Sequence, residues 1–259
     1  MSFANSFDGA KLWFDVLGQD GDPILLIAGN GCDHHTWDGV REELAKTHRV
    51  ISYDHRGTGQ SDANFPQQWS TRDFARDALS VLQAASCERA HVYGHSMGGR
   101  VAQWLAIDAP ESVGALILGA TSPGGENAVP RSAAATAAMA SNDPATLQRM
   151  CYTDAWIEVH GGATNASAPN PRSREAFIAH LMASTDHNAW DHLPGIKVPT
   201  LVIHGDEDQI TSVENAKVLA ARIPAARLMI VQSARHVYWA GFAEVNETVL
   251  AFCQEHRIV

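Results

Sequence analysis

The stretch GHSMGG, residues 94–99, follows the apolar run Ala90–Tyr93 and opens a segment with helical spacing, Met97–Asp108. Glycines stand two residues before and two residues after Ser96. This spacing predicts a sharp strand-to-helix turn that holds the serine in a strained backbone conformation, because side chains at the two flanking positions would collide. The turn also puts Ser96 at a helix N-terminus, where free N–H groups favour a developing oxyanion. A short GxSxG match can arise by chance, but its place between strand and helix favours a nucleophilic serine over an ordinary turn.

Short apolar runs without strict alternation surround this turn, as is typical of strands that are covered on both faces. Segments with helical spacing alternate with them, which predicts an α/β fold with a mostly parallel sheet flanked by helices. The predicted strands are Ile24–Ala28, Val50–Tyr53, Ala90–Tyr93, Ala115–Leu118, Thr200–His204 and Arg227–Val231. The predicted helices are Trp37–Lys46, Thr71–Ala85, Met97–Asp108, Val213–Ile223 and Phe242–His256.

Two parts of the chain depart from this alternation. Leu12, Phe14 and Val16 recur at every second position after Asp8-Gly9, which predicts an antiparallel pair at one edge of the sheet. About seventy residues, 122–195, separate two strands that one helix would normally connect, and loops of that length are rarely structureless. Helical signals at 131–140, at Asp143-Pro144 and at 173–182 predict a helical cap there. Residues 1–121 and 196–259 then form the core domain, with 122–195 as its cap insertion.

Composition narrows the functional classes. The 259 residues carry a formal net charge of −10, which argues against a nucleic-acid partner, because phosphate contacts need clustered Lys and Arg. Residues 1–14 have no continuous apolar core, so we expect neither a secretory signal nor a membrane anchor, and a cytoplasmic location. The four cysteines are far apart, which predicts reduced thiols rather than a disulfide framework or a zinc site.

A serine nucleophile needs a base, usually an imidazole that a carboxylate orients. His236 lies in the loop between the last predicted strand and the last helix, at the same sheet edge as Ser96. The strand at 200–204 is followed by Gly205 and three carboxylates in a row, of which we favour Asp208 as the orienting acid and keep Asp206 as the alternative. The predicted triad is Ser96, Asp208 and His236, in an order along the chain that α/β hydrolases share.

Four separated motifs resemble those of α/β-hydrolase-fold enzymes across nearly the whole chain: AGNG at 28–31, DHRGTGQS at 54–61, GHSMGG at 94–99, and GDEDQI at 205–210 with the later His236. In that family the acid typically follows the strand glycine by three residues, as Asp208 follows Gly205. The resemblance also implies an oxyanion hole made by the backbone N–H groups of Asn30 and Met97. Ala28 stands where the family usually has a histidine, which leaves the donor at position 30 or 31 open.

The resemblance gives the loop at 54–61 a structural role, in which Asp54, Arg56, Gly57, Gly59 and Ser61 hold one another and the oxyanion loop. Asp33, His34, His35 and Asp38 suggest a metal site, but adjacent histidine side chains tend to point apart and no ligand spacing recurs nearby. We therefore expect no metal and no cofactor.

The predicted activity is hydrolysis of a small-to-medium carboxylic ester or lactone through an acyl-enzyme on Ser96. The layout is similar to that of enol-lactone hydrolases and carboxylesterases. Cofactor-free perhydrolases and carbon–carbon bond hydrolases use the same triad, and some hydrolase-fold proteins are small-molecule receptors with little turnover, so these alternatives stay open. The substrate-lining candidates are tryptophans of the cap and loop tips: Trp37, Trp156, Trp190 and Trp239.

Overall fold

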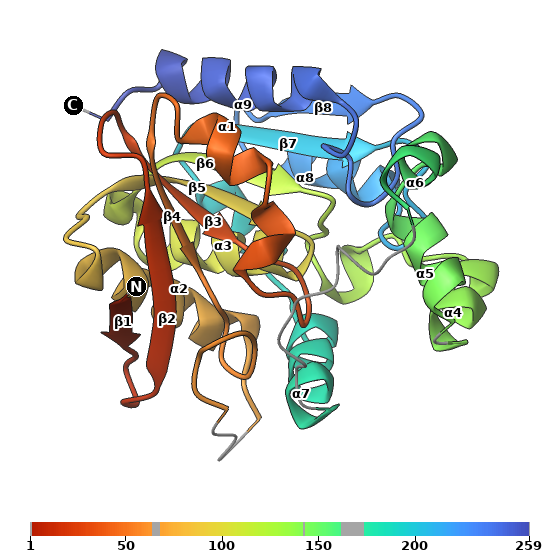
Figure 1. The fold of residues 1–259 in the computed structure, drawn as a ribbon, viewed down its shortest axis with the longest axis horizontal. Coiled ribbons are helices and arrows are strands. Elements are labelled where there is room, and N and C mark those ends of the chain that lie inside the picture. The colour runs from red at the N-terminus through yellow and green to blue at the C-terminus, as the bar shows by residue number, and fades with distance from the viewer. Residues whose placement is uncertain (1, 64–67, 142, 162–173, 259) are drawn as a thin grey trace.

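An eight-stranded sheet, ordered β1-β2-β4-β3-β5-β6-β7-β8, organises the computed structural model, which describes residues 2–63, 68–141, 143–161 and 174–258 (Figure 1). Strands β3 to β8 pair in parallel, whereas β1 and β2 are antiparallel at one edge. The strands are β1 Ser2–Asn5, β2 Lys11–Leu17, β3 Pro23–Ile27, β4 Arg49–Tyr53, β5 Ala90–His95, β6 Val113–Gly119, β7 Thr200–Gly205 and β8 Arg227–Val231. The predicted α/β fold, its six parallel strands and the N-terminal edge pair are confirmed.

Helices cover both faces of the sheet, each over its own apolar cluster (Figure 1). Helices α2 (Thr71–Ala84), α3 (Met97–Asp108) and α8 (Glu214–Arg222) pack on one face. Helices α1 (Val40–Leu44) and α9 (Ala243–Glu255) pack on the other. Because parallel strands buried on both faces need apolar residues at every position, this layering explains the uninterrupted runs in the sequence.

One predicted helix, 37–46, is wrong in its extent. The structure has a 3₁₀ turn η1 at His34–Trp37 and then the short α1, Val40–Leu44. Gly39 lies between them with φ 82°, a left-handed conformation that interrupts a right-handed helix. The apolar spacing across Gly39 therefore belongs to two separate turns.

The segment between β6 and β7, residues 120–199, contains four α-helices in its described part. They are α4 Ala133–Ala140, α5 Pro144–Cys151, α6 Asp154–His160 and α7 Arg174–Thr185. The side chain of Asp143 accepts the N–H of Thr146 at the start of α5, as the Asp-Pro pair predicted. The sequence analysis missed α6, which the Thr153 side chain caps. Figure 1 shows α4, α5 and α6 grouped beyond the carboxyl ends of the strands, with α7 apart from them.

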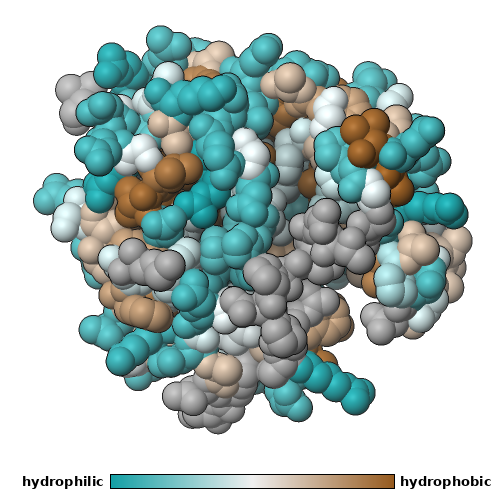
Figure 2. All heavy atoms as spheres, in the orientation of Figure 1, coloured by the Kyte–Doolittle hydropathy of each residue, from teal (hydrophilic) through white to brown (hydrophobic). Residues whose placement is uncertain are grey.

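The visible surface in Figure 2 is mostly hydrophilic, with small apolar patches between polar ones. None of the described helices combines the length and apolarity that crossing a bilayer requires. The large apolar side chains are instead concentrated in the two clusters that sandwich the sheet.

Candidate active site

Ser96 occupies the turn between β5 and α3 with φ 57° and ψ −117°, outside the regions that most side chains adopt. A Cβ on Gly94 would lie 2.3 Å from the carbonyl oxygen of Gly98, and a Cβ on Gly98 would lie 2.0 Å from that of Ile27. Both positions therefore require glycine, as the motif predicted. The Ser96 N–H donates to the Gly119 carbonyl at 2.8 Å, so the strained turn is tied to strand β6.

Asp208 and His236 lie together at the carboxyl ends of β7 and β8. The Nδ1–H of His236 donates to Oδ2 of Asp208 at 2.7 Å, and both side chains are buried. This bond leaves the lone pair of His236 on Nε2, the nitrogen that a general base needs. Asp206, the alternative acid, is exposed, and its backbone N–H donates to the Val231 carbonyl. The structure thus brings Asp208, and not Asp206, to the histidine.

Four donors converge on the Asp208 carboxylate. His236 Nδ1 and His204 Nε2 reach Oδ2 at 2.7 and 3.0 Å, while the N–H groups of Ile210 and Thr211 reach Oδ1 at 2.8 and 3.0 Å. Burial acts to raise the pKa of Asp208, but the charge of His236 and the hydrogen bonds from both histidines outweigh it and hold the pKa below its usual range. Asp208 is therefore ionised at neutral pH.

Sequence analysis missed two histidines that support this pair. His204, the residue before Gly205, also lies 2.9 Å from the Thr211 carbonyl, so its Nε2 carries the proton. His95 donates from Nε2 to the His236 carbonyl at 3.0 Å, and its ring centroid lies 4.7 Å from that of His236. Burial, followed by the charge of His236, lowers the pKa of His95 well below its ordinary value. A neutral His95 thus links the turn at Ser96 to the loop of His236.

Two atoms that could react, Ser96 Oγ and His236 Nε2, lie at the carboxyl edge of the sheet. Within residues 2–63, 68–141, 143–161 and 174–258, neither Ser96 Oγ nor His236 Nε2 has a hydrogen-bond partner. In free hydrolases the bond between nucleophile and base is commonly long and tightens when substrate binds. The arrangement of a strained serine beside an oriented imidazole can therefore support nucleophilic attack on a carbonyl carbon.

The predicted oxyanion loop lies against the serine. A Cβ on Gly29 would be 3.3 Å from Ser96 Cβ. In the described part of the chain, the N–H groups of Asn30 and Met97 have no acceptor. The N–H of Gly31, in contrast, donates to His180 Nδ1 at 3.2 Å. Of the two amides that the sequence left open, the one at position 30 is thus the amide without an acceptor among the described residues.

The loop at 54–61 is held by its own polar groups. Asp54 Oδ1 accepts from the N–H of His34 at 2.9 Å and lies 2.7 Å from His34 Nδ1. Its Oδ2 accepts from the N–H of Gln60 at 2.9 Å, and Ser61 Oγ donates to the Asp54 carbonyl at 2.7 Å. Arg56 forms a buried two-point ion pair with Asp77. These contacts tie β4 to the segment after β3.

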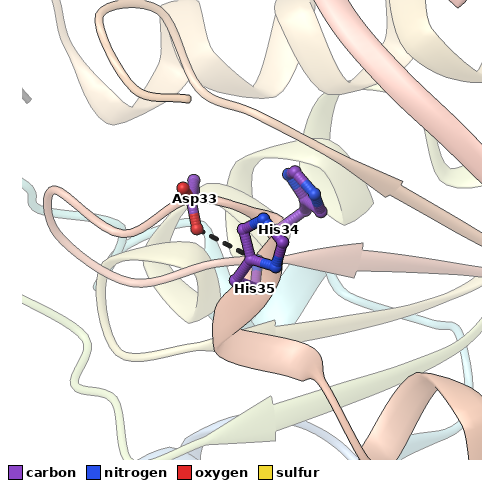
Figure 3. Close-up of side chains that lie close together, drawn as sticks. All are labelled: Asp33, His34 and His35. Atoms are coloured by element: carbon purple, nitrogen blue, oxygen red, sulfur yellow. Dashed lines mark hydrogen bonds between the residues drawn. The ribbon is translucent and has the colours of Figure 1, made fainter. Parts of the chain in front are cut away.

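Figure 3 shows Asp33, His34 and His35 close together at the start of η1. The expectation that the two adjacent histidines point apart is wrong, because their ring centroids lie 4.1 Å apart with planes tilted by 35°. Asp33 Oδ1 accepts the N–H of His35 at 3.0 Å, which closes the turn (Figure 3). Each of the three side chains offers one possible ligand atom, and these atoms lie within 4.8 Å of one another. However, Nδ1 of His34 lies 2.7 Å from Asp54 Oδ1, and Nδ1 of His35 lies 3.1 Å from Asp38 Oδ2. The absence of a bound metal stays a prediction.

The four predicted substrate-lining tryptophans do not form one cluster. Trp37 is fully buried and stacks on the half-buried Trp239 at 4.9 Å, and Trp239 meets the His95 ring edge-on at 4.6 Å. Trp156 stacks between Tyr152 and His160 on α6. Trp190 packs under the Arg222 guanidinium beside α8. Trp37 also meets the His95 ring edge-on, with centroids 6.3 Å apart. Trp239 and Trp37 thus both have ring contact with the histidine next to Ser96, and a pocket role for all four stays a prediction.

Comparison with known proteins agrees with this geometry. A model of the alpha/beta hydrolase fold matches residues 22–239. The relative named "Putative carbamate hydrolase RutD" from Azorhizobium caulinodans is 32% identical over 268 residues, covering 98% of this chain and 99% of that protein. Rhodomycin D methylesterase DnrP from Streptomyces peucetius is 29% identical, covering 88% of this chain and 90% of its own. Among solved structures, the enol-lactonase from Burkholderia xenovorans LB400 has a TM-score of 0.84 at 25% identity, covering 98% of this chain and all of its own.

Proposed function

The chain belongs to the α/β-hydrolase family, and on that premise we propose that it is a serine hydrolase that cleaves a small-to-medium carboxylic ester or lactone through an acyl-enzyme on Ser96. The observation that carries the proposal is the 2.7 Å hydrogen bond between His236 Nδ1 and Asp208 Oδ2 at the same sheet edge as the left-handed Ser96. A purely structural serine has no need of a strained backbone or of an oriented imidazole beside it.

In the proposed reaction, Ser96 Oγ attacks the substrate carbonyl carbon while His236 Nε2 takes the hydroxyl proton. The carbonyl π pair moves to oxygen, and the N–H groups of Asn30 and Met97 stabilise that oxyanion, each by about 3 kcal/mol. The bond to the leaving alkoxide then breaks, and His236 returns the proton to it. Water, deprotonated by the same histidine, releases the acid and restores Ser96.

Asp208 supports this cycle by holding the imidazole in one tautomer and by stabilising its charged form. Its depressed pKa, which follows from the charge of His236 and the hydrogen bonds of His204 and His236 after burial is overcome, keeps the carboxylate charged throughout. The reaction needs no group beyond these side chains, two backbone amides and water.

The names of the relatives support a substrate with a reactive carbonyl group, but they point to different classes of such substrates. One is named for carbamates, one for a methyl ester and one for an enol lactone. Each name implies attack on a carbonyl that bears an oxygen or nitrogen leaving group. Because the relative named for carbamates matches nearly the full length of both chains, carbamate hydrolysis is the second candidate, and it would use the same residues in the same roles.

The test compares the wild type with Ser96→Ala by intact mass after reaction with a fluorophosphonate probe, and by turnover of p-nitrophenyl acetate and butyrate. Ser86→Ala is the matched control, since Ser86 also has a left-handed backbone, with φ 52°, but is exposed beyond the end of α2. We expect labelling and turnover in the wild type and in Ser86→Ala, and neither in Ser96→Ala. A wild type that binds ligands but is neither labelled nor active would contradict the proposal and favour a receptor role.

A panel of lactones, methyl esters and aryl carbamates then separates the substrate classes. The central proposal predicts the highest kcat/KM on an ester or lactone. A higher kcat/KM on carbamates would replace it with the second candidate. Addition of hydrogen peroxide tests the perhydrolase alternative, because peracid formation would then exceed hydrolysis.

A further inference from the structure

His180 joins the segment between β6 and β7 to the oxyanion loop. It lies on α7, which is separated from that loop by about 150 residues of sequence, yet it is fully buried. Its ring packs against those of Phe74 and His55, with centroids 5.0 and 5.7 Å away. A polar ring that a peripheral helix inserts so deeply must have its nitrogens satisfied.

Both ring nitrogens of His180 bind the main chain at the edge of the candidate site. Nδ1 accepts the N–H of Gly31 at 3.2 Å, and Nε2 lies 2.8 Å from the carbonyl oxygen of Arg56. Since a carbonyl only accepts, Nε2 carries the proton and Nδ1 carries the lone pair. The two contacts together define one neutral tautomer and one ring orientation.

The Gly31 amide belongs to a tight turn. Cys32 N–H donates to the Gly29 carbonyl at 3.2 Å, which closes a four-residue turn with Asn30 and Gly31 at its centre. Gly31, the third residue of the turn, has φ 64°, a left-handed conformation that glycine adopts without steric cost. His180 therefore binds the N–H of the central peptide, and this contact resists rotation of that peptide.

The same turn is held from its other end. His55 Nε2 donates to the Ala28 carbonyl at 3.1 Å, directly before Gly29. With Ala28 and Gly31 both fixed by histidines, the peptide between Gly29 and Asn30 has one orientation. Its N–H, which has no acceptor in the described part of the chain, is the Asn30 donor of the proposed oxyanion hole.

We propose that His180 is a positioning residue that sets the orientation of the Asn30 N–H through its hydrogen bond to Gly31. The inference rests on the proposed function, since an oxyanion forms only if Ser96 attacks a carbonyl. It makes the catalytic rate depend on α7, a helix outside the sheet core. Small errors in the direction of such a donor are costly, because a misplacement of about 1 Å can lower a rate about 100-fold.

Two substitutions separate the two ring nitrogens. In His180→Asn, the side-chain oxygen takes the place of Nδ1 and can still accept from Gly31, but the donor to Arg56 is lost. In His180→Gln, the side-chain nitrogen takes the place of Nε2 and can still donate to Arg56, but the acceptor for Gly31 is lost. Each variant removes the same buried ring and one of its two hydrogen bonds, so they are matched for a general loss of packing.

We expect His180→Gln to lower kcat for p-nitrophenyl butyrate by about 100-fold with little change in KM, and His180→Asn to stay within about fivefold of the wild type. The inhibition constant of an alkyl trifluoromethyl ketone, which forms an oxyanion on the serine, should rise in proportion to the loss of kcat. Equal kcat values for the two variants, or wild-type kcat in His180→Gln, would overturn the inference.

If His180→Gln fails to fold, ¹⁵N NMR of the wild-type imidazoles tests the same geometry. An unprotonated Nδ1 on His180 supports the inference, and a protonated Nδ1 contradicts it. A wild type that shows no turnover and no labelling of Ser96 contradicts the proposed function itself, and the inference with it. A labelled, active wild type with two equal variants contradicts this inference alone.

Discussion

Two Asp–His pairs of the same length lie at the carboxyl edge of the sheet. Asp54 follows β4 and contacts His34 Nδ1 at 2.7 Å, and Asp208 follows β7 and contacts His236 Nδ1 at 2.7 Å. All four side chains are buried. By length and burial alone the two pairs are equivalent, so these quantities do not identify a catalytic pair.

The pairs differ in what surrounds the histidine. The His34 ring contacts the rings of Trp13 and His35, each with its centroid 4.1 Å away, and the backbone N–H of His34 also donates to Asp54. The His236 ring instead lies beside His95, the residue before the strained Ser96. We expect the first histidine to hold its loop in place and the second, which lies beside the neighbour of the proposed nucleophile, to move a proton. Substitutions at Asp208, Asp54, His204 and His55 test and extend this distinction.

Asp208→Asn should have the largest effect. The amide cannot stabilise a charged imidazole and favours the wrong tautomer, so we expect kcat to fall by about 10⁴-fold, measured on p-nitrophenyl butyrate. Asp206→Asn is the matched control, since Asp206 is two residues away and exposed, and it should retain wild-type activity. If Asp208→Asn kept its kcat within tenfold of the wild type, the Asp208–His236 pair would have only a structural role, as we expect for Asp54–His34.

Asp54→Asn should act on stability instead. Its amide nitrogen cannot accept the N–H of Gln60, which Asp54 Oδ2 now accepts at 2.9 Å, and a hydrogen bond to a charged group contributes about 2 kcal/mol. We expect the free energy of unfolding in urea to fall by that amount while kcat stays within tenfold. Asp38→Asn serves as the control, because the contact of Asp38 with His35 is exposed and should contribute less than about 0.5 kcal/mol. A large loss of kcat at unchanged stability in Asp54→Asn would remove the distinction between the pairs.

Much of the carboxyl edge of the sheet could be predicted from the sequence, because its strands and loops are marked by local patterns such as apolar runs and glycine spacing. Glycine spacing marks Ser96, and the third position after Gly205 marks Asp208 through the resemblance to α/β hydrolases. The positions of His95, His180 and His204 carry no such signal, since a buried histidine in a strand or helix looks like any packed residue until its partners are known. Helix α6 and the break at Gly39 were missed for the related reason that short turns have weak periodicity.

Substitutions of His204 test whether the second histidine on Asp208 matters. His204→Asn withdraws the donor from Asp208 Oδ2, whereas His204→Gln places a nitrogen where Nε2 was and keeps it. We expect about a tenfold lower kcat in the first and near wild-type kcat in the second, as one lost charge-assisted hydrogen bond costs about 1.5 kcal/mol. Steady-state kinetics on both variants, with KM recorded separately, measures this. Equal loss in the two variants would mean that His204 acts through packing.

His55 extends the comparison to a histidine whose Nε2 donates to a backbone carbonyl, that of Ala28, instead of to a carboxylate. Burial, followed by the nearby His180, lowers the pKa of His55 to about 3, although the hydrogen bond to Ala28 opposes this. In the unfolded chain the pKa of a histidine is about 6.5, so between pH 6.5 and 3 the unfolded state binds the extra proton. The contribution of neutral His55 to the free energy of unfolding is therefore complete above pH 6.5. It is lost on acidification, by up to about 1.4 kcal/mol per pH unit.

Urea unfolding at pH 7, 6, 5 and 4 measures how the free energy of unfolding depends on pH. His55→Gln keeps a donor for the Ala28 carbonyl but cannot titrate, so it should remove the contribution of one proton, up to about 1.4 kcal/mol per pH unit. The difference in stability between the two proteins should be constant from pH 7 upward and should shift steadily in favour of the variant below pH 6. Asp54 and Asp208 are unchanged in both proteins, so the effect of their titration cancels in that difference. If the free energies of unfolding of the two proteins changed in parallel with pH, His55 would be solvated or protonated in the folded state. A neutral histidine would then not hold the turn at residues 29–32 through the Ala28 carbonyl.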